Sequence, residues 1–163
     1  MATLTTDNID QKTQEDTSQF LTFQLGGEEY GLDILSVQEI RGYVAPTRLP
    51  NSPHHVTGVL NLRGSIVPLY DMRRMFDLEE VEYDQFSAII VATIDANIIG
   101  LVVDRVSEVI TASTSDIQPA PNVSSSAAQG CVRGILRHEE HLVILLDAHN
   151  LLGGSENDGA LAA

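Results

Sequence analysis

The sequence predicts an all-β protein made of two small barrels packed together. Short apolar runs alternate with Gly, Pro, Asn and Asp along most of the chain, which is typical of strands joined by tight turns. The pattern also recurs, and each half of the chain offers about five short strands, the number that a small closed barrel needs. At 163 residues the chain can bury a sizeable core without disulfides or metals.

The first predicted element is a hairpin. Leu21, Phe23 and Leu25 share one face of a strand, and a pair of glycines then turns the chain. The apolar alternation continues over residues 30–34. We therefore expect two antiparallel strands here.

A second hairpin is predicted within residues 58–76, GVLNLRGSIVPLYDMRRMF. Gly64 and Ser65 are the expected two-residue loop, with Gly where a type II′ turn needs a positive φ. In that register Arg63 lies opposite Ile66.

The end of this hairpin carries two further signals. Pro68 has no amide hydrogen to donate to a ladder, so we expect its strand to lie at a sheet edge or to carry a bulge. Asp71 is predicted to cap a short helix, because its carboxylate can accept the free amides of the first turn.

Two gapless alignments define the repeat. Residues 20–40 lie over residues 89–109, and residues 66–76 lie over residues 142–152, at offsets of 69 and 76. The copy at 89–109 is apolar on both faces, so either the first barrel or another protein should cover its outer face.

The repeat and the composition suggest one ordered domain at 19–152. Within it we expect a first barrel at about 19–82 and a second at about 83–152, and strand exchange between them is left open. The polar ends, 1–18 and 153–163, are predicted to be a disordered tail and a flexible tail.

Charge and hydropathy argue against several classes of protein. A net charge of -14 disfavours nucleic-acid binding, which needs a basic patch. The longest apolar runs, 88–94 and 98–103, are too short to cross a bilayer, so no direct membrane insertion is expected. The lone Cys131 and the lack of a recognisable signal peptide favour a reducing, cytoplasmic setting.

No motif for catalysis, for a cofactor or for a metal stands out. The strongest metal candidate combines His138 and His141 with His149, but the spacing of the first two is one residue short of a zinc-helix motif and they are expected at a turn. A solvated acidic loop is the favoured interpretation, and a His-dependent metal-binding protein is the alternative from another class. Cys131 opens an apolar strand and is expected in the core.

Two charged residues are candidates for binding a partner. A tight hairpin would present the guanidinium of Arg63 with little entropy left to lose on binding. Glu39 follows Val37 on an acidic and apolar strand. Both could equally be ordinary surface charges, and Glu39 could be an edge charge that discourages aggregation.

Four segments closely resemble the CheW family of bacterial chemotaxis coupling proteins: 28–43, 58–73, 98–109 and 117–121. The resemblance implies two intertwined SH3-like five-stranded barrels with short helices, and no enzymatic activity. It also implies an adaptor that couples methyl-accepting chemotaxis receptors to the histidine kinase CheA and thereby controls kinase activity. A paralogous coupling protein of a non-flagellar chemosensory pathway is the alternative within this class.

The resemblance also implies partners and sites. The partners would be the regulatory domain of CheA and the cytoplasmic tip of the receptors, and they would recruit a cytoplasmic protein, monomeric when alone, to membrane receptor arrays. Receptor contacts carried over by this resemblance are Val37, Glu39, Arg63, Val103 and Val106. The kinase contact falls near Gly58, where a purely backbone requirement for glycine is the alternative explanation.

Overall fold

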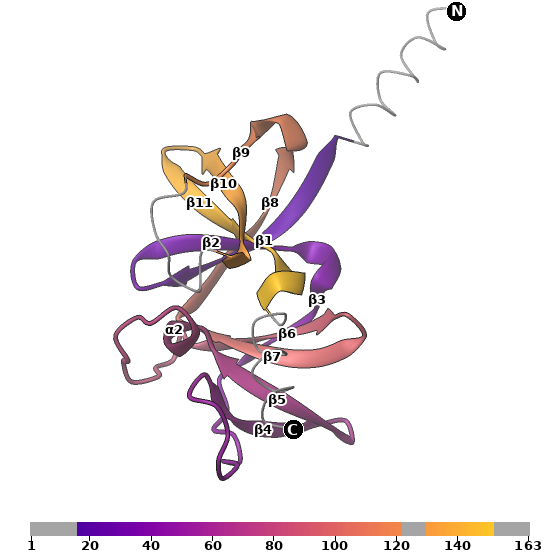
Figure 1. The fold of residues 1–163 in the computed structure, drawn as a ribbon, viewed down its shortest axis with the longest axis vertical. Helices are drawn as coiled ribbons and strands as arrows, with labels where there is room; N and C mark the ends of the chain where they lie inside the picture. Colours follow the sequence, from indigo (N-terminus) through magenta and orange to yellow (C-terminus); the bar gives the residue numbers. More distant parts are fainter. Residues whose placement is uncertain (1–15, 122–129, 152–163) are drawn as a thin grey trace, which may run out of the picture.

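The computed structural model describes residues 16–121 and 130–151. They form two β-sheets that lie one above the other along the long axis of the molecule (Figure 1). Sheet A has six strands in the order β8-β1-β2-β11-β10-β9, and sheet B has five in the order β3-β6-β7-β5-β4. The predicted all-β class is confirmed. No helix in the described ranges is long and apolar enough to span a membrane.

The chain contributes its elements in two similar series. The first comprises β1 (Thr17–Leu25), β2 (Glu28–Asp33), η1 (Ile34–Ser36), β3 (Val37–Gly42), β4 (Val56–Leu62), β5 (Ser65–Asp71) and α2 (Met72–Met75). The second comprises β6 (Ala88–Ile94), β7 (Asn97–Val103), β8 (Arg105–Ser113), η2 (Thr114–Asp116), β9 (Ile117–Gln118), β10 (Val132–His138) and β11 (His141–Leu146). The repeat read from the sequence is therefore present in the strands.

The predicted tails fall largely outside the described part of the chain. Residues 1–15 and 152–163 are not described, and neither is the internal segment 122–129. β1 begins at Thr17, two residues before the expected start of the domain.

Each sheet takes strands from both copies of the repeat. Sheet A combines the β1–β2 hairpin with β8 to β11, and sheet B combines the β6–β7 hairpin with β3 to β5. The joints are two parallel pairings, β2 with β11 and β5 with β7. In Figure 1 the indigo β1 and β2 accordingly lie among orange and yellow strands. Each sheet therefore contains strands from both sides of residue 83, the expected boundary between the two barrels.

Apolar side chains form three clusters that explain this arrangement. One cluster, which we call the shared cluster, contains residues of both sheets and joins them. A second lies within sheet A around Phe20 and Leu145, and a third lies within sheet B around Leu69 and Ile89. Each sheet therefore has an interior of its own, as expected of two barrels, and the barrels share a third apolar contact.

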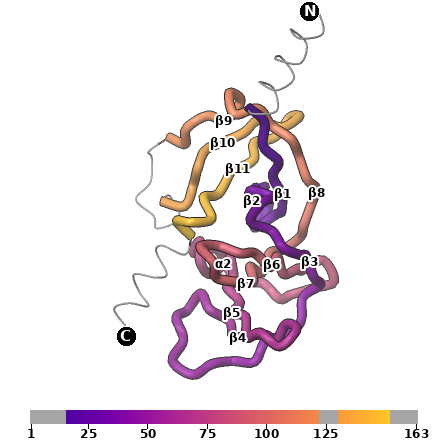
Figure 2. The backbone as a smooth tube through the Cα atoms, turned by 90° about the vertical axis from the view of Figure 1, so that its right-hand side faces the viewer, coloured from indigo at the N-terminus to yellow at the C-terminus, as the bar shows by residue number. Residues whose placement is uncertain are grey.

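The β6–β7 hairpin is apolar on both faces because it lies between two of these clusters. Ile89 and Val91 belong to the sheet B cluster, whereas Ile90 and Ala92 belong to the shared cluster. The shared cluster also includes Phe23 of β1, and Figure 2 shows β1 and β2 next to β6 and β7. The outer face of this hairpin was expected to be covered either by the first barrel or by another protein. The structure shows that other strands of this chain cover it.

The β4–β5 hairpin turns one residue earlier than predicted. Leu62 pairs with Ser65, so the loop is Arg63 and Gly64, with φ values of 51° and 88°. Two successive positive φ values define a type I′ turn, not type II′. The side-chain oxygen of Asn61 accepts a hydrogen bond from the Gly64 amide at 3.1 Å, which favours this loop.

Of the two alternatives expected at Pro68, the edge strand is wrong, whereas the β4–β5 ladder does carry a register shift next to it, between the pairs Gly58–Leu69 and Val56–Tyr70. β5 lies between β4 and β7, and β4 forms the edge. The amide and carbonyl of Val59, opposite Pro68, bond to Thr47 instead, at 2.8 and 2.9 Å. Pairing of β5 with β7 starts only at Leu69, so no neighbouring strand needs an amide from Pro68.

The predicted helix cap at Asp71 is confirmed. Its Oδ1 accepts hydrogen bonds from the amides of Arg73 at 2.9 Å and Arg74 at 3.4 Å. Its Oδ2 accepts the hydroxyl hydrogen of Tyr83 at 2.5 Å, and burial together with this bond raises the pKa of Tyr83. Asp71 therefore also holds the connection between β5 and β6.

Candidate binding surface

The fold brings two of the predicted binding residues together. Arg63 lies in the β4–β5 loop and Glu39 lies on β3, with Nη2 of Arg63 3.4 Å from Oε2 of Glu39. The side chain of Arg63 is 83% exposed and that of Glu39 is 29% exposed. Because β3 and β4 are the two edges of sheet B, this ion pair links them and indicates that the sheet curls toward closure.

Exposed apolar side chains lie on the same strands as this ion pair. Ile66, on β5 just after the loop, is 67% exposed, and Ile40, which follows Glu39 on the opposite face of β3, is 45% exposed. An exposed ion pair contributes at most about 1 kcal/mol to folding stability, so the fold does not depend on it. Charge beside exposed apolar area is instead typical of a surface that binds another protein.

The three predicted valines occupy two different environments. Val37 on β3 and Val106 on β8 are equivalent in the repeat, and both are half-buried against the shared cluster. They lie at the rim of the contact between the sheets. Val103 is only 2% exposed and shares a strand face with the buried Leu101, which corrects the expectation that it lines a binding surface.

Gly58 lies beneath another segment of the chain. It is buried on β4 at a register shift, and a Cβ atom there would lie 2.3 Å from the carbonyl oxygen of Thr47. Its φ of 154° is also one that side-chain-bearing residues rarely adopt. The backbone therefore requires glycine here, and any partner contact nearby would be made by the covering segment, residues 44–50.

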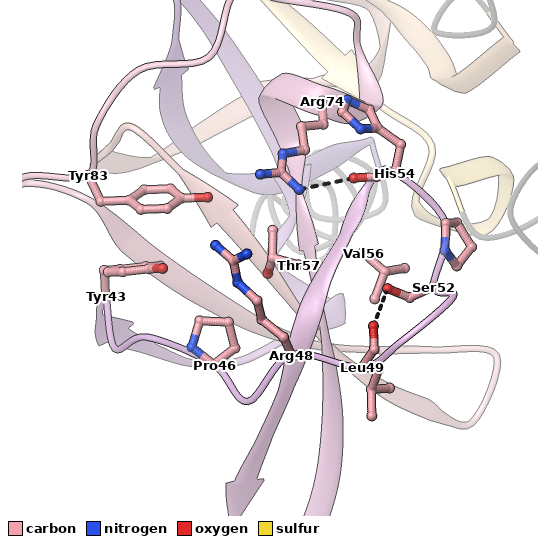
Figure 3. Close-up of a pocket in the computed structure, with 11 residues that line it drawn as sticks. Tyr43, Pro46, Arg48, Leu49, Ser52, His54, Val56, Thr57, Arg74 and Tyr83 are labelled. Carbon is pink, nitrogen blue, oxygen red and sulfur yellow. Dashed lines mark hydrogen bonds between the residues drawn. The ribbon is translucent and has the colours of Figure 1, made fainter.

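A hollow of about 270 Å³ adjoins that covering segment (Figure 3). The rings of Tyr43 and Tyr83 stack beside it with centroids 4.0 Å apart, and Arg48 and Arg74 reach it from the covering segment and from α2. No pattern in the sequence predicts this hollow. Its lining is spread over 43–83 without a motif, so no spacing in the sequence could indicate it.

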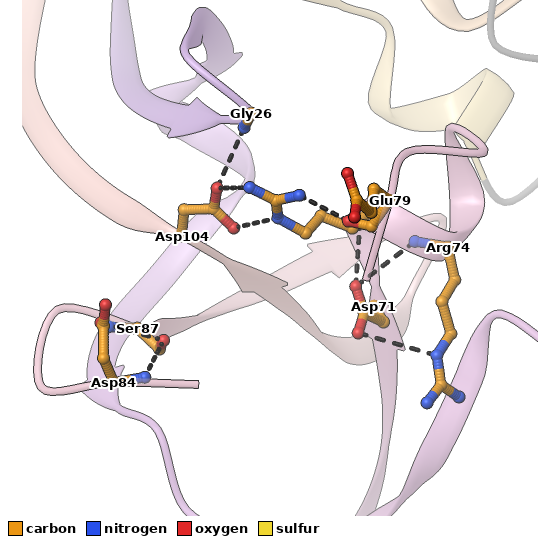
Figure 4. A network of polar contacts seen from close by, with 8 residues as sticks. Gly26, Asp71, Arg74, Glu79, Asp84, Ser87 and Asp104 are labelled. Carbon is orange, nitrogen blue, oxygen red and sulfur yellow. Dashed lines mark hydrogen bonds and ion pairs between the residues drawn. The ribbon is translucent and has the colours of Figure 1, made fainter. Parts of the chain in front are cut away.

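A polar network around α2 ties the two sheets together (Figure 4). Nε and Nη2 of Arg73 donate to the two carboxylate oxygens of Asp104 at 2.7 and 2.6 Å. The Gly26 amide, in the β1–β2 turn, donates to Oδ2 of Asp104 at 2.9 Å. Since Arg73 lies on α2, the network joins the end of β5 in sheet B to the first hairpin of sheet A.

The network changes the acidity of its members. Burial alone would raise the pKa of Asp104, but the hydrogen bonds from Arg73 and Gly26 and the charge of Arg73 outweigh it, so this pKa lies below its ordinary value. The hydrogen bond to Asp104 in turn raises the pKa of Arg73. Both groups remain charged at neutral pH, which suits a structural link.

The histidines of the alternative metal site do not form a ligand set. His138 and His141 pair across the β10–β11 loop, where the sequence predicted a turn, and Nε2 of His138 lies 3.8 Å from Oε2 of Glu108. Nδ1 of His149 lies 2.5 Å from Oδ2 of Asp95 instead. Over residues 16–121 and 130–151, no three His, Cys, Asp or Glu side chains could hold a metal ion.

Cys131 behaves as the core residue that the sequence predicted. It is buried in the shared cluster, and its thiol donates to the carbonyl oxygen of Asn150 at 3.6 Å. Burial raises the pKa of this thiol, and the nearby Asp147 adds to the effect. A raised pKa lowers the thiolate fraction and makes Cys131 a poor nucleophile.

The fold and this surface define a protein-binding module of the two-barrel, all-β class. The chain belongs to the CheW family, since the CheW-like domain model matches residues 19–156. It is 44% identical over 138 residues to Chemotaxis protein CheW of Klebsiella aerogenes, covering 85% of this chain and 83% of that one. It is 33% identical over 142 residues to Chemotaxis protein CheW of Rhizobium meliloti, covering 87% and 92%.

A solved structure supports the same assignment. The crystal structure of the scaffolding protein TtCheW from Thermoanaerobacter tengcongensis matches with a TM-score of 0.77 and 34% identity, covering 82% of this chain and 91% of that chain. The resemblance predicted from the sequence is confirmed. The chain is a chemotaxis scaffold of the CheW type.

Proposed function

We propose that this chain is a non-enzymatic adaptor that couples methyl-accepting chemotaxis receptors to the histidine kinase CheA and so controls kinase activity. Family membership supports the scaffold role. The observation that carries receptor coupling is the Arg63–Glu39 ion pair, exposed beside Ile66 where the edges of sheet B meet.

This surface suits a helical partner. The cytoplasmic tip of a receptor presents amphipathic helices, and Ile66 offers an apolar contact for one helix face. The charges of Arg63 and Glu39 would fix the register of that helix. The two-residue loop restrains the backbone at Arg63, so less entropy is lost on binding. Val37 and Val106 would border the contact.

We assign the kinase contact to the segment that covers Gly58, with the regulatory domain of CheA as the partner. In this proposal the protein works in the cytoplasm as a monomer until its partners recruit it to receptor arrays at the membrane. Protein contacts alone would then hold it there.

The test is co-sedimentation with receptor-containing membranes, with and without CheA. We expect the chain to sediment with the membranes and to bring CheA with it. Arg63→Ala and Glu39→Ala should each lower the affinity for receptor-containing membranes by about tenfold, because each removes a charge that fixes the register of the bound helix. Their unfolding midpoints should stay close to that of the unchanged protein, since exposed charges rarely affect stability by more than about 0.5 kcal/mol.

Arg137→Ala is the matched control, because Arg137 is exposed on β10 of sheet A. Equal loss of sedimentation in all three variants would indicate a general effect of charge and contradict the assigned surface. A folded chain that recruits no kinase to membranes containing its receptors would contradict the adaptor function itself.

A further inference from the structure

The hollow beside the segment that covers Gly58 has no part in the proposed receptor contact. None of its lining residues belongs to the Arg63–Glu39 pair or to its apolar neighbours. Its polar lining converges on one space although it comes from distant parts of the chain. It adjoins the segment to which the kinase contact is assigned, residues 44–50, but its polar lining does not depend on that contact.

The hollow concentrates positive charge in an acidic protein. The whole chain has nine Lys and Arg residues against 23 Asp and Glu, yet Arg48 and Arg74 both line this one space. Figure 3 shows their guanidinium groups reaching toward each other, with Thr57 nearby. Burial and the negative charge of Asp71 raise the pKa of Tyr43, and the charges of both arginines oppose that rise, which is consistent with both arginines lying near its ring.

The two arginines differ in how they are held. Arg74 is half-buried and oriented: its Nη1 donates to the carbonyl oxygen of His54 at 3.2 Å, and its Nε donates to Oε1 of Glu80 at 2.9 Å. The same Nε lies 3.9 Å from Oδ2 of Asp71. Arg48 is exposed, and no hydrogen bond or ion pair to it is found among the described residues. One guanidinium is thus fixed in place, and the other has its donors available.

The dimensions limit the ligand to a small one. Its volume of about 270 Å³ lies just below the usual range for drug-sized ligands and is ample for a phosphate-sized group. A planar guanidinium matches two oxygens of a carboxylate or phosphate through parallel hydrogen bonds. We propose that this hollow binds a phosphate-sized oxyanion between Arg48 and Arg74.

Glu80 is an internal competitor in this site. Its carboxylate occupies the Nε donor of Arg74 from the connection between β5 and β6, and its side chain is mostly exposed. A bound oxyanion must share Arg74 with Glu80 or displace it. Removing the charge of Glu80 should therefore strengthen anion binding, because it frees the Nε donor of Arg74.

The experiment is a titration of the full chain with inorganic phosphate at constant ionic strength, followed by amide chemical shifts. We expect saturable shifts at residues around the hollow. Arg48→Gln should weaken binding by about tenfold through loss of a charge-assisted contact, and Glu80→Gln should tighten it several-fold. Arg137→Gln, a control on sheet A, should leave the affinity unchanged. Phenyl phosphate as a second probe distinguishes a free phosphate site from one that also takes a monoester against the tyrosine wall.

Three results would overturn the proposal. Shifts that grow linearly without saturation would mean that phosphate acts only as background salt. Equal weakening by Arg48→Gln and Arg137→Gln would mean that overall charge, not this hollow, attracts the anion. If Arg48→Gln lowers the unfolding midpoint, Arg48→Lys is the variant to test in its place. Lysine keeps the positive charge but lacks the planar guanidinium, so the affinity for phosphate should be intermediate. Unchanged affinity in that variant would also contradict the site.

Discussion

Two glycines at equivalent positions show what the fold demands of single residues. A Cβ atom would lie 2.3 Å from the Thr47 carbonyl oxygen at Gly58 and 2.7 Å from the Gln118 carbonyl oxygen at Gly134. Each glycine lies at a register shift of its strand pair, on β4 and on β10. Because both copies of the repeat bring a neighbouring backbone this close, the requirement at Gly58 belongs to the design of the barrel.

We expect Gly58→Ala to lower the free energy of unfolding by roughly 2–3 kcal/mol, since the new methyl group meets backbone and not a movable side chain. Urea unfolding followed by circular dichroism measures this. Gly42→Ala is the control, because a Cβ atom there meets nothing within 4 Å. A Gly58→Ala protein of normal stability that fails to recruit kinase would instead support direct contact.

The equivalent of Arg63 carries the opposite charge. Glu139 occupies the matching place in the β10–β11 loop, with φ of 56° against 51° for Arg63. In that copy Glu108, the equivalent of Glu39, lies near His138. The two loops therefore share a positive φ at their first residue but not at their second, where Gly64 has a φ of 88° and Glu140 is not in the positive region. They also differ in charge, and the proposed receptor contact applies to sheet B alone.

Among the elements, the short helix α2 connects the two sheets. Asp71 caps it, and its Arg73 reaches across to Asp104, which also holds the first turn of sheet A through Gly26. Four helical residues would not be stable alone, so α2 depends on these contacts. In return it fixes the end of β5 against the other sheet.

Asp104→Asn should lower the free energy of unfolding by about 1–2 kcal/mol at neutral pH, a value reduced for the partial exposure of the pair. The pKa of Asp104 is depressed in the folded protein, so its contribution is complete above its unfolded pKa of about 3.9 and is lost as pH falls through the folded pKa.

Urea unfolding at several pH values from neutral to about 3 tests this dependence on charge. The difference between the unchanged protein and Asp104→Asn should be constant down to about pH 5 and should shrink in more acidic solution. Glu82→Gln, at an exposed position, provides the control. A difference that persists undiminished in acid would show that the carboxylate charge is not the cause.

At the scale of the whole molecule, the exchange of hairpins makes each sheet depend on both copies of the repeat. β1 and β2 are separated in sequence from the strands that complete sheet A, and the same is true of β6 and β7 in sheet B. The shared cluster then buries side chains of both hairpins together. Neither sheet can form fully from one contiguous half.

Fragments 1–82 and 83–163 should therefore not fold cooperatively when produced separately. Mixed in equal amounts, they should recover strand signal and a single unfolding transition, because each supplies the hairpin that the other lacks. Circular dichroism and size-exclusion chromatography measure both. A cooperative transition in either fragment alone would contradict the interdependence of the sheets.

Local and periodic signals determined much of this protein from its sequence. Alternation of apolar residues predicted the strands, the offsets of 69 and 76 predicted the repeat, and Asp71 was identified as a cap. The resemblance to the CheW family likewise rests on contiguous segments. Such features depend on neighbouring residues, and so they can be read along the chain.

Only the tertiary structure decided which hairpin joins which sheet, because periodicity gives the faces of a strand but not its partner. The loop at Arg63 lies one residue earlier than predicted, and the hydrogen bond from the Gly64 amide to the side chain of Asn61 favours that position. Val103 is buried because strands distant in the sequence pack over it. The hollow near Arg48 likewise forms between segments that are apart in the sequence. Burial and cavities arise from long-range contacts, for which no spacing in a single sequence gives a signal.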